Sequence, residues 1–99
     1  MFKKLEAIVE RYNKLQELVA DPAVLQKMDE WKSYTKEIAD MQETVEKYLD
    51  YKKAESEQNA AKEAMETETD PEMKEMLSEE FYSLKDKLEA MKSELRILL

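Results

Sequence analysis

The final third of the chain carries a narrow apolar stripe with the period of a helix. Its large side chains recur at alternating spacings of four and three residues, at Leu77, Phe81, Leu84, Leu88, Met91, Leu95 and Leu98. A stripe of this width is typical of a coiled-coil seam, which needs a partner helix. Asp70 and Pro71 come just before it, and an Asp cap followed by Pro begins a helix sharply. We therefore expect a helix over residues 71–98 that packs on an upstream helix.

The partner is expected in the middle of the chain, where residues 30–66 contain neither Pro nor Gly. Asp29 is the expected cap, and the unbroken helix would be about 55 Å long. Its stripe consists of Trp31, Tyr34, Ile38, Met41, Val45, Tyr48, Tyr51, Ala54, Gln58, Ala61 and Met65. Because the side chains are large up to Tyr51 and small or polar after it, the first half can hold two neighbours and the second half one. We expect an antiparallel hairpin with its tip at residues 67–69.

Two shorter helices are expected before this hairpin. Apolar residues at three- and four-residue spacing run from Phe2 to Val19 and predict an amphipathic helix over residues 2–20. Asp21 and Pro22 repeat the helix-start signal and predict a small elbow helix over residues 22–27. The predicted fold is all-α, a helical bundle of a short N-terminal helix, a small elbow helix and a long antiparallel two-helix coiled-coil hairpin. We expect a single domain over residues 1–99, with three helices together at one end.

Several side chains in this scheme have more than one interpretation. Trp31 is expected as a core anchor where three elements meet. Of Tyr48 and Tyr51, one is expected to face outward if the other faces the seam. The seven Met residues, some of them near the hairpin tip, fit either a gap-filling role in the core or a recognition surface.

The composition excludes most kinds of chemistry. The chain has no Gly, His or Cys, so it lacks Gly-rich phosphate loops, a near-neutral acid-base side chain, thiol nucleophiles and the usual zinc ligands. Carboxylates are plentiful, but a di-metal site in a helical bundle would also need His. We therefore expect no enzymatic activity, cofactor, metal or small-molecule ligand. The chain has no apolar run long enough to span a membrane, and its net charge of −8 disfavours DNA binding.

The first helix is the only segment that is not acidic. Residues 1–20 hold four basic side chains against three acidic ones. The basic residues, Lys3, Lys4, Arg11 and Lys14, fall within about 100° on a helical wheel. One interpretation is a solvated face supported by intrahelical ion pairs such as Glu10 with Lys14. The other is a patch that contacts phosphate groups.

The order of these signals along the chain is more specific than any one of them. They are the opening Met1–Ile8, Arg11-Tyr12, Leu15, Leu18, Asp21-Pro22, Trp31, Lys36-Glu37, and Asp70-Pro71-Glu72 before a helix rich in Leu and Glu. In this order and at these distances they resemble the N-terminal domain of the bacterial peptide chain release factor 1 family. The resemblance covers all 99 residues and favours the class I factors that read UAA and UAG.

The resemblance implies a role in translation termination in the cytoplasm. In that family the N-terminal domain approaches the stalk base of the large ribosomal subunit, while later domains read the stop codon and promote peptidyl-tRNA hydrolysis. The Gly-Gly-Gln motif of those later domains is not among these residues, which contain no Gly. The resemblance therefore implies a docking role. Lys3, Lys4, Arg11 and Lys14 would be the residues that contact ribosomal RNA, and the acidic hairpin would face protein.

A different class of function also fits the sequence. The seam between Ala54 and Leu98 could serve a free-standing structural or chaperone-like coiled coil that associates with other copies of itself. Antiparallel pairing within one chain and between chains uses the same seam, so the heptad pattern leaves the oligomeric state open.

Overall fold

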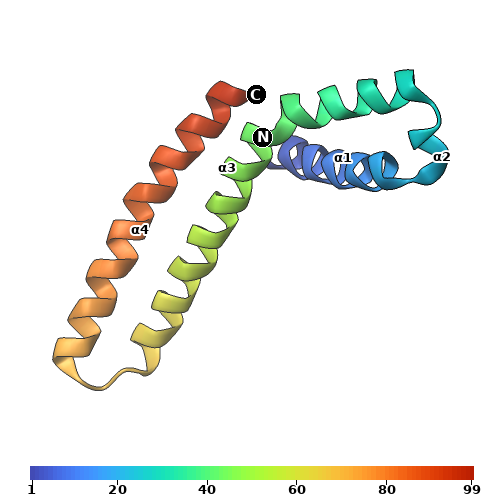
Figure 1. The fold of residues 1–99 in the computed structure, drawn as a ribbon. Coiled ribbons are helices and arrows are strands. Elements are labelled where there is room, and N and C mark those ends of the chain that lie inside the picture. The colour runs from blue at the N-terminus through green and yellow to red at the C-terminus, as the bar shows by residue number, and fades with distance from the viewer. The chain divides into compact units, whose positions relative to one another are not determined.

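The computed structural model describes all of residues 1–99 and contains four helices and no strand (Figure 1). Helix α1 spans Phe2–Ala20, α2 spans Pro22–Leu25, α3 spans Met28–Thr67 and α4 spans Pro71–Leu98. The all-α prediction, with a short first helix, a small elbow and a long hairpin, is confirmed.

Two helices begin at an Asp-Pro pair, as the sequence predicts. The Asp21 carboxylate accepts a hydrogen bond from the backbone N–H of Ala23 at 2.9 Å, and the Asp70 carboxylate accepts one from Glu72 at 3.3 Å. Each bond satisfies a backbone donor that has no partner inside the helix. The Pro that follows each Asp needs no such bond and already has a helical φ.

The boundary between α2 and α3 lies earlier than the sequence predicts. Helix α2 ends at Leu25, and α3 begins at Met28. The backbone N–H of Lys27 donates to the Val24 carbonyl, while the Lys27 carbonyl already accepts from Trp31. Because Lys27 accepts the first helical hydrogen bond of α3, the prediction that Asp29 caps this helix is wrong. Asp29 lies in its first turn.

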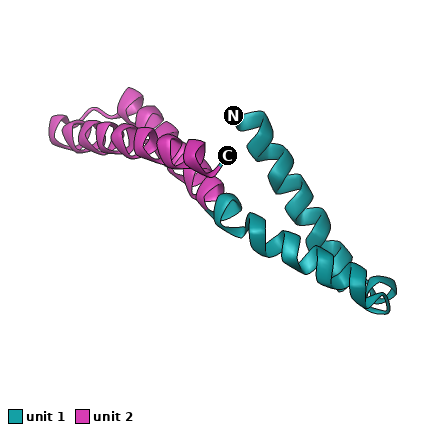
Figure 2. Ribbon diagram, turned by 90° about the horizontal axis from the view of Figure 1, so that it is seen from above, with its two compact units in different colours: residues 1–46, 99 teal, residues 47–98 magenta.

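The chain divides into two compact units, and the division falls within α3 (Figure 2). One unit comprises residues 1–46 with Leu99 and holds α1, α2 and the first part of α3. The other comprises residues 47–98 and holds the rest of α3 and nearly all of α4. The expected grouping of three helices at one end depends on how these two units are placed relative to each other, so it stays a prediction.

The first unit is a helical hairpin closed by the elbow. Helices α1 and α3 lie side by side and antiparallel here, with α2 at the turn (Figures 1 and 2). Leu5 and Leu15 of α1 are fully buried, and Val24 is buried at the elbow. Trp31, expected as a core anchor, is half-buried. Two packed helices leave the border of their contact accessible to water, which agrees with the partial burial of Trp31.

The second unit is a longer hairpin whose core becomes thinner towards its tip. Its buried residues are Tyr48, Tyr51, Ala54 and Ala61 of α3 and Leu84, Leu88 and Leu95 of α4. The predicted change from large to small side chains along α3 is therefore found within the core. Ala54 and Ala61 are buried like the two Tyr residues before them but contribute far less side-chain volume to the core.

The expectation that Tyr48 or Tyr51 faces outward is wrong. Both side chains are 4% exposed, and their rings stack with centroids 6.5 Å apart. Residues three positions apart are neighbours on one helix face, so the two rings share the seam. The ammonium of Lys52 lies 5.6 Å from the centre of the Tyr48 ring.

The buried Leu residues of the hairpin should contribute far more to stability than an exposed one. We expect Leu88→Ala to lower the free energy of unfolding by about 2–5 kcal/mol, because it removes a buried side chain and leaves a cavity. Leu49→Ala is the matched control, since Leu49 is 49% exposed in the same unit, and should cost about 1 kcal/mol or less. Urea unfolding followed by far-UV circular dichroism measures both. Equal losses would contradict the core described here.

Candidate interaction surface

The four predicted basic residues lie on one exposed face of α1. Lys3, Lys4, Arg11 and Lys14 are all exposed. They come from turns one to four of a single helix, and the helical period alone places them on the same side of it. Only Arg11 and Lys14 lie within ion-pair distance of carboxylates, however, so the four residues do not form one free patch.

Arg11 is held by a carboxylate of the neighbouring helix. Its guanidinium donates from Nε to Oε1 of Glu37 at 2.9 Å and from a terminal nitrogen to Oε2 at 3.0 Å. This fork-to-fork geometry is the strongest form of a charge-assisted pair. Hydrogen bonding to Arg11 lowers the pKa of the Glu37 carboxyl, and Glu37 in turn raises the pKa of Arg11. The pair joins α1 to α3 within the first unit and engages two of the nitrogens of the Arg11 guanidinium.

The partner role of Glu37 was not predicted, although the sequence carries a signal for it. In an antiparallel hairpin, residues equally distant from the turn lie opposite each other. Arg11 and Glu37 each lie 13 residues from Val24, the buried residue of the elbow. The longer hairpin follows the same rule, because Lys47 and Glu94 pair at 3.1 Å and lie equally far from the Asp70-Pro71 turn.

The remaining three cations are less constrained. Lys14 approaches Glu17, one turn away on the same helix, at 3.9 Å. Both side chains are well exposed, and such pairs contribute little. Lys3 and Lys4 form no ion pair. The part of the predicted patch that remains open to a partner is therefore mainly Lys3 and Lys4, with Lys14 about three turns further along the same helix.

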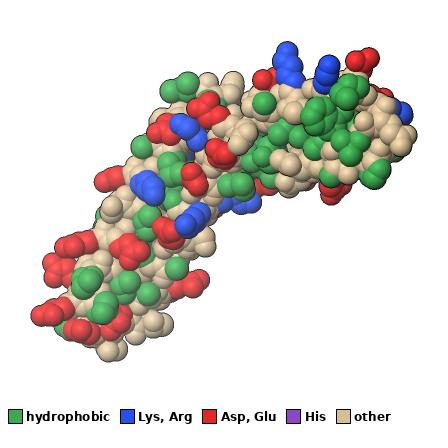
Figure 3. Space-filling view, in the orientation of Figure 1, with side chains coloured by type: hydrophobic (Ala, Val, Ile, Leu, Met, Phe, Trp, Pro, Cys, Tyr) green, Lys and Arg blue, Asp and Glu red, His purple; other side chains and the backbone are tan.

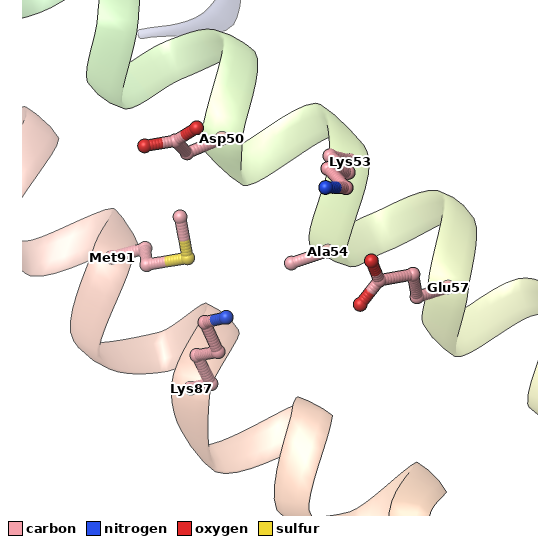
Figure 4. Close-up of a pocket in the computed structure, with 6 residues that line it drawn as sticks. All are labelled: Asp50, Lys53, Ala54, Glu57, Lys87 and Met91. Carbon is pink, nitrogen blue, oxygen red and sulfur yellow. The ribbon is translucent and has the colours of Figure 1, made fainter.

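A hollow of about 330 Å³ lies between α3 and α4 in the second unit (Figure 4). Its lining residues are Asp50, Lys53, Ala54, Glu57, Lys87 and Met91. Ala54 leaves the space, because a larger side chain there would fill the seam. Two carboxylates and two ammonium groups line the hollow, so it presents no strong charge of one sign to a ligand.

Other features of a structure can also mark a functional site. No group of three or more Asp or Glu side chains is placed to hold a metal ion, and no buried polar side-chain atom lacks a hydrogen-bond partner. None of the four helices has an apolar stretch of the length that a membrane crossing requires. The exposed helix faces are the candidate functional surfaces.

Comparison with known proteins identifies the family. The model of the PCRF domain matches residues 8–99 of this chain. Because the match covers nearly the whole chain, the chain belongs to the PCRF domain family. The family resemblance expected from the order of the helix-start signals is confirmed.

Several relatives identified by sequence share one name. Peptide chain release factor 1 of Geobacillus sp. (strain WCH70) is 42% identical over 99 residues, and the protein of that name from Lysinibacillus sphaericus (strain C3-41) is 40% identical over the same length. In both cases the alignment covers 100% of this chain and 28% of the relative. The chain thus spans little more than a quarter of the length of these relatives. No solved structure matches it.

The Arg11–Glu37 pair should be visible as a depressed carboxyl pKa. We expect Glu37 to titrate below the ordinary value of 4.5, and Arg11→Gln to move its pKa back towards that value because the charge-assisted bonds are lost. Carboxyl carbon shifts followed by NMR against pH measure this. Lys14→Gln, which removes a cation from the same helix, is the control and should leave Glu37 unchanged.

The same pair should make stability depend on pH in a definite direction. Glu37 has a lower pKa in the folded than in the unfolded chain. Its contribution is therefore present above about pH 4.5 and is lost as the pH falls through the folded pKa. Arg11→Gln should accordingly destabilise the chain at neutral pH and make little difference in strong acid. A deficit that persists undiminished in acid would contradict this origin.

Proposed function

We propose that this chain is the N-terminal helical domain of a translation termination factor. The observation that carries the proposal is the 42% identity along all 99 residues to a peptide chain release factor 1. The whole protein would direct stop-codon-dependent peptide release at UAA and UAG in the cytoplasm. The chain's own part in this would be to dock on the ribosome.

A docking role agrees with what these residues contain. They include no Gly, His or Cys, and the Gly-Gly-Gln motif of peptide release would belong to another part of the protein. The domain would be non-enzymatic and would need no cofactor. Its two hairpins expose long polar helix faces, which suit contact with a large assembly better than enclosure of a small substrate.

The basic face of α1 is the proposed contact to ribosomal RNA, at the stalk base of the large subunit. Lys3 and Lys4 are exposed and have no ion pair within the chain, so they are available to phosphate groups. Arg11 is already engaged by Glu37, and its share in such a contact would be smaller. The proposed contact is therefore centred on the first turn of α1.

The coding sequence beyond codon 99 tests the proposal as a whole. We expect the reading frame to continue into a region that encodes Gly-Gly-Gln. A stop codon directly after Leu99 would instead favour a free-standing structural or chaperone-like coiled coil.

Charge reversal on α1 tests the proposed RNA contact. In the full-length factor, Lys3→Glu with Lys4→Glu should weaken binding to ribosomes, and the slope of log affinity against log salt should fall by about two, as expected for two lost phosphate contacts. Lys85→Glu with Lys87→Glu makes the same change in charge on α4 and is the matched control. Binding and salt slope that equal the control's would refute the contact while leaving the family membership intact.

A further inference from the structure

The negative charge of the chain is concentrated at the tip of the longer hairpin. We define the hairpin tip as residues 63–80. It holds eight acidic side chains and one basic one, Lys74. The tip thus has a net charge of −7 out of −8 for the whole chain, and the other 81 residues are nearly balanced. All of its carboxylates except that of Glu68 are exposed.

Two large apolar side chains are exposed among these charges. Met73 is 44% exposed and Met76 is 62% exposed. Figure 3 shows hydrophobic side chains set among acidic ones at this end of the hairpin. The helical period makes Met73 and three carboxylates the neighbours of Met76, because Glu72, Glu79 and Glu80 are three or four residues from it. An apolar centre with an acidic rim results.

Only two of the charged side chains of the tip have an evident role inside the chain. Glu68 and Asp70 serve the turn, where they accept hydrogen bonds from the backbone N–H groups of Thr69, Asp70 and Glu72. The other carboxylates repel one another, which opposes folding. They do not gather into a group that could hold a metal ion. Dispersed exposed carboxylates of this kind match several cations spread along a chain better than a single ion.

We propose that the hairpin tip is a docking surface for a basic, amphipathic segment of a partner protein. Apolar side chains of the partner contact Met73 and Met76, whose flexible thioether side chains adapt to different shapes. Lys or Arg side chains of the partner pair with Glu72, Glu79 and Glu80. Nucleic acid is disfavoured because its phosphates are repelled by the tip. The inference rests on the tip itself and not on the proposed function.

A synthetic peptide provides the probe. It is a helical peptide with Leu along one face and Lys along the other, added to the 99-residue chain labelled with ¹⁵N. We expect the amide shifts that change on binding to cluster within residues 63–80, and the affinity to fall with added salt. An oligolysine of equal length, a Leu-Glu peptide and an oligouridylate RNA are the comparison probes. They should bind weakly or not at all.

Variants separate the apolar and charged contributions. Met73→Ser with Met76→Ser should weaken peptide binding about tenfold, as expected for the loss of partly buried apolar contact, while Met73→Leu with Met76→Leu should retain it. Glu72→Gln, Glu79→Gln and Glu80→Gln together should weaken binding and reduce its salt dependence. Glu10→Gln, Asp40→Asn and Glu43→Gln together neutralise the same number of exposed charges in the first unit and should leave binding unchanged.

Four outcomes would overturn the proposal. Equal affinities for oligolysine and for the amphipathic peptide would show that the methionines contribute nothing. Shift changes spread over acidic residues outside the tip would show non-specific attraction. Binding of the RNA at residues 63–80 would contradict the charge argument. An apparent mass that rises with concentration in the parent chain and not in the Met-to-Ser variant would make the tip a self-association surface. Since every variant here lies outside α1 or serves as a control, these outcomes are distinct from failure of the RNA contact.

Discussion

The two chain reversals are the constraint on which the rest of the structure depends. A chain without Gly cannot use left-handed turn residues at no steric cost, and both reversals here precede helices capped by Asp21 and Asp70. Each cap determines where the next helix begins, and the position of the turn determines which residues of two antiparallel helices face each other. The Arg11–Glu37 and Lys47–Glu94 pairs follow from the two turns.

Hairpins of two helices have little interior, and this determines where function can lie. The only large side chains that are completely buried are those of Leu5, Leu15 and Leu95. The hollow over Ala54 is lined by charges of both signs and presents a mixed surface to solvent. Differences between faces of the molecule therefore come from exposed side chains, above all from their charge. This agrees with the proposed docking role of the domain.

The sequence predicted the elements better than their contacts. Asp-Pro pairs and apolar stripes are local signals, and they were enough to place four helices and the long hairpin. The elbow was predicted too long, because Lys27 accepts the first hydrogen bond of α3 and no side-chain signal marks that position. An apolar stripe also predicts which side of a helix is buried, but not which residues of another helix lie against it. For this reason the sequence did not place both Tyr48 and Tyr51 in the seam or reveal that Glu37 engages Arg11. The class of protein came from the joint order of the signals, since each of them alone is common in helical proteins.

The structure changes the balance between the two charged surfaces that the sequence suggests. The basic patch becomes weaker, because Arg11 is neutralised by Glu37 and Lys14 lies near Glu17. The carboxylates of the acidic tip are not paired in this way, since all of them except that of Glu68 are exposed and only Glu68 and Asp70 serve the turn. The dominant electrostatic feature of the chain is therefore negative. In the proposed docking on a ribosome, the phosphate groups of the RNA would repel the tip and attract α1, so the encounter would favour orientations in which the tip meets basic protein.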